Sequence, residues 1–158
     1  MAYALVKTLH LLAVVVWLGG MFFAHFCLRP AAMALPPAQR VPLMASALGR
    51  FFRAVAASIG LIFVSGGWML WHVATNTHRT GAPFNMPLEW LVMTVLGVTM
   101  MLIFGHIRFA LYKRLQRAVA AQDWPAGGEA LVAIRGWVAI NLAIGAVILL
   151  VVTMGTGN

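Results

Sequence analysis

The first apolar stretch of the chain, residues 7–30, reads KTLHLLAVVVWLGGMFFAHFCLRP. It is long enough to cross a bilayer as a helix, because about 20 apolar residues span the hydrocarbon core. His10 and His25 lie fifteen positions apart in it, so a helix separates them by roughly 22 Å and brings one near each membrane face. Both project to similar sides, on a stripe that also contains Trp17 and Met21. Because an ionisable side chain inside a span usually faces a bundle interior, a partner or a cofactor, this stripe marks a candidate functional face.

The composition is that of an integral membrane protein. Of the 158 residues, 63% are hydrophobic and 9% are charged, whereas soluble domains carry roughly a quarter charged residues. The net charge of +8 does not indicate nucleic acid, because the charges flank apolar runs and form no basic face. The single cysteine, Cys27, excludes an internal disulfide and any Cys-x-x-Cys motif. The first run lacks a basic segment before it and a small-residue cleavage site after it, so we expect a retained span.

Four apolar runs predict four membrane spans, at about residues 3–28, 52–75, 88–111 and 133–154. Short connections make neighbouring spans antiparallel. The predicted fold class is therefore all-α, an integral membrane up-and-down four-helix bundle, with residues 1–158 as a single domain. We also expect a short surface helix near residues 42–50 and a turn-rich loop over residues 122–129.

The basic residues predict the orientation of the bundle. Nine of the eleven lie in the first and third connections and the helix ends beside them: Arg29, Arg40, Arg50, Arg53, Arg108, Lys113, Arg114, Arg117 and Arg135. Because cytoplasmic loops are enriched in lysine and arginine, these two connections are expected to be cytoplasmic. Both termini and the second loop are then on the outer, periplasmic side of a bacterial-type inner membrane, which the chain crosses several times.

Four histidines sort by depth into two pairs. His10 and His72 fall in the outer half of the bundle, and His25 and His106 fall near its inner end. Haem b requires two imidazoles on facing helices with an apolar slot between them. The pairs therefore predict one or two haems per chain, with these four histidines as ligands to the haem iron.

Haem propionates would need cations at the membrane surfaces. Lys7 and Arg79 are the candidates outside, and the candidates inside are Arg29, Arg50, Arg53, Arg108 and Arg135, with Lys7, Arg53 and Arg108 taken first. A stacked pair of haems would carry electrons across the membrane, so the corresponding activity is that of a membrane oxidoreductase, a b-type cytochrome. Quinone, superoxide or a periplasmic redox partner are the candidate electron partners. The lipid bilayer is the expected surrounding, and small residues within the spans leave a homodimer open.

A copper-binding hypothesis competes with haem. Met21 precedes His25 by four residues, and Met69 precedes His72 by three. Thioether sulfur together with imidazole suits Cu(I), so the chain could be a copper transporter or a copper-binding protein that uses these four residues and His106. In a third hypothesis the protein is a non-catalytic membrane subunit whose histidines are structural.

The stretch from Lys7-x-x-His10 through Trp17-Leu-Gly19-Gly20 to Arg29-Pro30 resembles the opening helix of the CopD family, named for copper resistance. The end of the third span at Gly105-His106 and the entry to the fourth at Arg135 are also similar to small CopD-type proteins. Membership would imply an inner-membrane protein linked to copper handling.

The first stretch is also similar to HemJ, a haem-binding membrane protein of protoporphyrinogen oxidation, in which the histidine matched by His10 is important. Two departures separate this chain from HemJ. Thr94 stands where HemJ has a lysine, and the Asn-Glu-x-Pro signature is absent after Arg135. The resemblance therefore favours haem at His10 without implying the oxidase activity.

Overall fold

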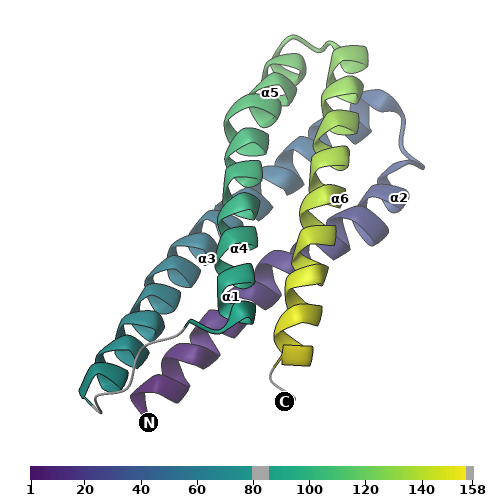
Figure 1. Ribbon diagram of the computed structural model, residues 1–158. Coiled ribbons are helices and arrows are strands. Elements are labelled where there is room, and N and C mark those ends of the chain that lie inside the picture. The colour runs from purple at the N-terminus through teal and green to yellow at the C-terminus, as the bar shows by residue number, and fades with distance from the viewer. Residues whose placement is uncertain (80–85, 156–158) are drawn as a thin grey trace.

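The computed structural model describes residues 1–79 and 86–155, and that part of the chain is all-α, without strands. Its elements follow one another as α1 (Ala2–Phe23), η1 (Ala24–Leu28), α2 (Arg29–Ala32), α3 (Pro37–Arg79), α4 (Leu88–His106), η2 (Ile107–Leu111), α5 (Tyr112–Ala120) and α6 (Trp124–Gly155). The two η segments are π-helical turns inside otherwise continuous helices, which makes four long helices in all (Figure 1).

Each of these helices is long and apolar enough to cross a membrane. At most 17% of the most apolar window of each helix is buried inside the protein. Large apolar side chains face outward instead, as in Phe63, Leu102 and Leu150, which are 67%, 71% and 59% exposed. So much outward apolar surface is stable only against lipid. The protein is therefore a multi-pass membrane protein, and the predicted fold class is confirmed.

The helices run up and down, as expected. Helix α1 packs along α3, helix α4 packs along α6, and α6 also contacts α1, α3 and α5. Both termini lie at one end of the bundle, together with the end of α3 and the start of α4 (Figure 1). The α5–α6 turn and the start of α3 lie at the opposite end, with the nine basic residues predicted to be cytoplasmic. We call these the termini end and the arginine end.

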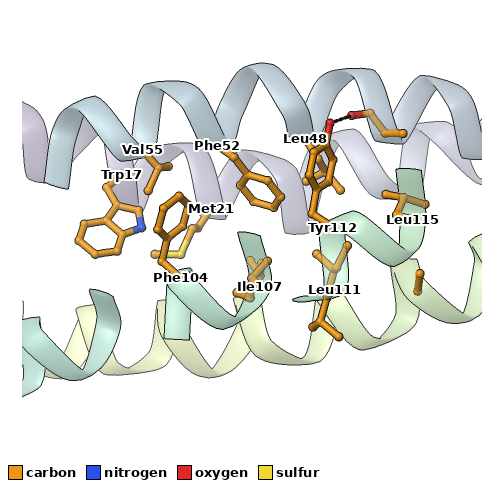
Figure 2. Packing of buried hydrophobic residues seen from close by; sticks show 14 of the residues in the cluster. Trp17, Met21, Leu48, Phe52, Val55, Phe104, Ile107, Leu111, Tyr112 and Leu115 are labelled. Carbon is orange, nitrogen blue, oxygen red and sulfur yellow. Dashed lines mark hydrogen bonds between the residues drawn. The ribbon is translucent and has the colours of Figure 1, made fainter. Parts of the chain in front are cut away.

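The core contains residues of all four long helices, and a cluster of aromatic rings lies where α3, α4 and α5 meet (Figure 2). Phe52 is 2% exposed, and its ring packs edge-on against Phe104 and Tyr112, at centroid distances of 5.9 and 5.2 Å. The Tyr112 hydroxyl donates a hydrogen bond of 3.0 Å to the carbonyl of Ala45, drawn as the dashed line in Figure 2. This bond fixes α5 against the first half of α3, because a buried hydroxyl is stable only with a partner.

The expected short surface helix over residues 42–50 is wrong as a separate element, because it forms the beginning of α3. Pro42 removes one backbone hydrogen bond, but it stands only five residues after the helix begins. Val41, Met44 and Leu48 recur at helical spacing and are buried, so this segment gains packing energy by continuing as a helix. The third helix is likewise longer than its predicted span and continues through η2 to Ala120.

The expected loop over residues 122–129 is also wrong, because α6 begins at Trp124. Asp123 caps the helix: its side-chain oxygen accepts a 3.0 Å hydrogen bond from the backbone N–H of Ala126. Pro125 lies in the first turn, where a missing N–H breaks no helical bond. The second connection was expected over residues 75–86; α3 continues to Arg79, and residues 80–85 lie outside the described part of the chain.

Candidate functional site

The stripe predicted on the first helix faces the interior of the bundle. The buried residues of α1 are Ala13, Trp17 and Met21, which are 4%, 4% and 2% exposed. Figure 2 shows Trp17 and Met21 beside Phe104 in the core. His10 lies near the termini end of this face and is half-buried. The helix therefore presents its functional side chains to its neighbours and not to lipid.

His10 is held against α3 by a hydrogen bond. Its Nδ1 lies 2.9 Å from Oγ of Ser65, which is 4% exposed. The Ser65 hydroxyl donates its single proton to the carbonyl of Leu61, so its oxygen accepts from Nδ1–H of His10. A neutral imidazole that donates from Nδ1 carries its lone pair on Nε2. His10 is thereby fixed in the tautomer that can bind a metal through Nε2.

His72 has different partners, farther toward the termini end. Its ring stacks on Trp68 at a centroid distance of 5.0 Å and an interplanar angle of 11°. The Tyr3 ring lies 5.9 Å away, and the side-chain amide of Asn76 donates to His72 Nε2 at 3.3 Å. The Nε2 lone pair of His72 therefore already accepts a hydrogen bond, and a metal would bind this nitrogen only by displacing Asn76.

Met69 lies between the two histidines on the face that α3 turns to α1. It follows Ser65 by four residues and precedes His72 by three, so it shares their side of the helix. Met69 and His72 are both half-buried. We call His10, Ser65, Met69 and His72 the α1–α3 seam.

The seam does not bring His10 and His72 onto one iron atom. His10 lies beside Ser65, and seven residues of helix put His72 about 10 Å farther along α3. A metal between two imidazoles needs their nitrogens roughly 4 Å apart, twice a metal–nitrogen bond of about 2 Å. The helices also pack directly at His10, where Cε1 is 3.4 Å from the place of a Cβ on Gly66. This geometry gives the haem prediction no support.

The inner histidines also have separate surroundings. His106 is exposed at the end of α4, and its ring packs edge-on against Trp137 at 5.3 Å. His25 lies in η1 and lines a cavity on another side of α6, together with Leu131 and Arg135. Around the α6 axis, Trp137 and Leu131 are about 120° apart, because six residues at 100° each make 600°. His25 and His106 were predicted to form a pair because they lie at a similar depth in the membrane. They lie beside different faces of α6, so they do not face each other.

The cavity beside His25 has a volume of about 240 Å³ and lies between η1, α2, α3 and α6. Arg29, Arg40 and Arg135 line it. Nδ1 of His25 is buried and has no hydrogen-bond partner within the described residues. We call these four residues and the space they surround the arginine cavity.

The predicted propionate cations are distributed between the two ends. Arg53 and Arg108 line a second cavity of about 250 Å³ with Arg50, and the Arg108 guanidinium lies 5.1 Å from the centre of the Tyr112 ring. Lys7 is exposed on α1, near the termini. The three cations therefore do not surround one ligand.

Met21 occupies the buried middle of α1, away from both histidine groups. Its sulfur accepts a hydrogen bond of 3.7 Å from the side-chain amide of Asn141, which is 1% exposed. The Asn141 side-chain oxygen is buried without a partner. In the described part of the chain no three His, Cys, Asp or Glu side chains gather into a metal-binding group.

A family model described as copper resistance protein D matches residues 45–154, more than two thirds of the chain. The chain belongs to this family. No curated protein and no solved structure matches it. The comparisons therefore support the predicted CopD membership, and they do not support the resemblance to HemJ.

The CopD match covers the α3 half of the seam, including Ser65, Met69 and His72, and it also covers His106. It does not cover α1, where His10 and His25 lie. Family membership therefore does not depend on the first stretch, although that stretch is the one whose resemblance is most distinctive in the sequence. The family description makes copper the metal against which the possible ligands of the seam are considered.

Sequence reasoning did not find Ser65, Arg40 or the role of Asn141. Ser65 opens the run Ser65-Gly66-Gly67, a group of small residues that indicates close helix approach. That signal predicts contact with another helix but not with a histidine. Arg40 gave no signal beyond its charge, because only the packing of α3 on α6 and on α2 brings it to the cavity.

Proposed function

We propose that this CopD-family protein handles copper in the membrane by binding Cu(I), as cargo, along the α1–α3 seam. The family is named for copper resistance, and the chain crosses the membrane several times. The seam offers two imidazoles and a thioether, which are ligands that suit Cu(I). Apolar helices around these donors favour a soft cation of single charge over a strongly hydrated divalent one.

The orientation of His10 is the observation that carries the proposal. Ser65 holds Nδ1–H of the ring, which leaves the Nε2 lone pair for a metal. Metal-binding histidines commonly have such a partner on their other nitrogen, because it fixes both tautomer and ring orientation.

Met69 gives the seam two overlapping donor pairs. Along α3 it lies four residues, about 6 Å, from Ser65 at the level of His10, and three residues, about 4.5 Å, from His72. A flexible methionine side chain can therefore serve either imidazole in turn. Copper would be bound by Met69 with His72 nearer the termini end and by Met69 with His10 nearer the centre.

The proposed copper site ends at the seam. Farther along α1, the Met21 sulfur already accepts a hydrogen bond from Asn141, and His25 lies in the arginine cavity, whose positive charge repels a cation. His106 is exposed beside Trp137 and does not belong to the seam.

The proposal includes a location and an orientation. Nine of eleven basic residues gather at the arginine end, which makes that end cytoplasmic in a bacterial-type inner membrane. The seam, which lies toward the other end, then faces the periplasmic side.

The test is Cu(I) binding by the detergent-purified protein under reducing conditions, measured by competition with a chromogenic chelator. His10→Ala and Met69→Leu are expected to weaken binding at least tenfold, about 1.4 kcal/mol per factor of ten. The matched controls are His78→Ala and Met93→Leu, which remove the same side chains outside the seam. Equal binding by seam and control variants would overturn the proposal.

A visible spectrum of the same sample, oxidised and dithionite-reduced, separates copper from haem. The copper proposal predicts no sharp reduced bands. Bands that His10→Ala abolishes would return the interpretation to a b-type cytochrome.

A further inference from the structure

The arginine cavity has the wrong charge for copper and the right one for an anion. Three arginines from three helices line it: Arg29 from α2, Arg40 from α3 and Arg135 from α6. None of the three carboxylates in the chain is among the residues that line it. The cavity therefore concentrates positive charge without an internal counterion, a state that an anion would stabilise.

His25 also lines this space. Its Nδ1 is buried, without a hydrogen-bond partner in the described residues, and is not exposed to the cavity. The charge of the arginines therefore determines which ligand the cavity can hold.

The remaining walls of the cavity are apolar, and its rim lies on the outward surface. Leu48 and Val138 are among the buried wall residues. Met33 and Val132 also line the cavity and are 53% and 58% exposed. The cavity is therefore open toward the surface that faces lipid, and Arg29 directly follows the apolar run of α1.

We propose that the arginine cavity binds the phosphate headgroup of an anionic phospholipid from the cytoplasmic leaflet. Arginine pairs with phosphate through two parallel hydrogen bonds, and basic pockets between membrane helices are typical headgroup sites. The apolar walls fit the glycerol and upper acyl chains, which a free phosphate does not have. The cavity volume of about 240 Å³ is more than ten times the roughly 10–15 Å³ that one water needs.

The lipid would also join elements that meet around this cavity. Residues of η1, α2, α3 and α6 line it together. A phosphate held by Arg29, Arg40 and Arg135 would connect all three helices through charge-assisted hydrogen bonds.

The experiment is native mass spectrometry of the full chain in mild detergent with an equal mixture of phosphatidylglycerol and phosphatidylcholine. We expect roughly tenfold more bound phosphatidylglycerol than phosphatidylcholine. The double variant Arg40→Gln/Arg135→Gln is expected to lose this preference. The control Arg114→Gln/Arg117→Gln removes two exposed arginines of α5 and is expected to keep it.

The other outcomes are decisive as well. No preference in the wild type, or equal loss in both double variants, would overturn the proposal, because attraction would then be absent or spread over the surface. Thermal stabilisation by inorganic phosphate without lipid preference would overturn the lipid source and assign the cavity to a free anion. If the glutamine variant fails to fold, the double variant Arg40→Lys/Arg135→Lys replaces it, because lysine keeps the charge. A partial loss of the lipid preference in this variant supports the proposal. An unchanged preference overturns the role of the guanidiniums. Copper binding at the seam is measured separately, so either proposal can fail alone.

Discussion

Ser65→Ala is the most informative substitution in the seam, because it leaves every proposed copper ligand in place. The variant removes only the hydroxyl that accepts the hydrogen bond of 2.9 Å from His10 Nδ1. Without that bond the ring can rotate and can exchange its proton between the two nitrogens. Part of the population then presents N–H instead of a lone pair toward the metal.

The expected magnitude follows from the bond that is lost. A neutral hydrogen bond contributes about 0.5–1.5 kcal/mol net, and 1.4 kcal/mol is a factor of ten in affinity. Outer partners of metal-binding histidines typically change metal affinity by about 10–100-fold. We therefore expect Cu(I) affinity to fall about tenfold in Ser65→Ala, with His10→Ala falling at least as far. The fold should be unaffected, because alanine fits where serine was and favours the helix.

The assay is chelator competition for Cu(I), with helical content checked by circular dichroism. Ser58→Ala is the matched control, since Ser58 is also buried, at 7% exposed, and lies two turns away on the same face of α3. Wild-type affinity in Ser65→Ala together with weakened binding in His10→Ala would refute the orienting role of Ser65. An equal fall in Ser58→Ala would show that the effect comes from α3 packing and not from the histidine.

Three further substitutions test the fold around the site, each by thermal unfolding in detergent. Tyr112→Phe removes the buried hydrogen bond to the carbonyl of Ala45 and should cost about 1 kcal/mol. Asp123→Ala removes the cap of α6 and should cost about 1 kcal/mol, with loss of helix at its start. Gly127→Ala places a Cβ about 2.6 Å from Cγ1 of Val41, which is fully buried, and should cost about 1–3 kcal/mol.

Each of these predictions has an outcome that contradicts it. An unchanged unfolding temperature in Tyr112→Phe would mean that the hydroxyl bond does not hold α5 on α3. Full stability in Asp123→Ala would place the start of α6 later than Trp124, as the sequence alone suggests. Gly128→Ala is the control for Gly127→Ala, because nothing lies within 4 Å of a Cβ at that neighbouring glycine. Equal losses in the two alanine variants would therefore argue against the contact with Val41.

The boundaries of the helices show where sequence patterns reach their limit. The turn residues Pro125, Gly127 and Gly128 predict a loop, yet they lie in the first turns of α6. Proline is tolerated there, and Gly127 serves as the contact point with Val41. This local pattern fits a loop and the first turns of a helix equally well. The contact with the neighbouring helix α3 decides in favour of the helix.

Sequence alone determined the class of the protein. Four apolar runs and few charges require membrane helices, because backbone groups in lipid must be satisfied within each helix. The clustering of basic residues indicated which helix ends lie together, and the spacing of Trp17 and Met21 indicated the inward face of α1. Each of these inferences depends on a period or a composition that is local in the chain.

Tertiary structure decided which side chains become partners. Matched depth suggested that His10 would face His72 and His25 would face His106, but depth fixes position along the membrane normal only. The rotation and stagger of the helices are set by their packing. That packing places Ser65 beside His10, and it brings three arginines to the cavity that His25 also lines. Side chains one or two positions apart on a helix point to different faces. Which of them meet a neighbouring helix depends on how the helices are rotated and staggered, and the sequence pattern of one helix does not contain that information.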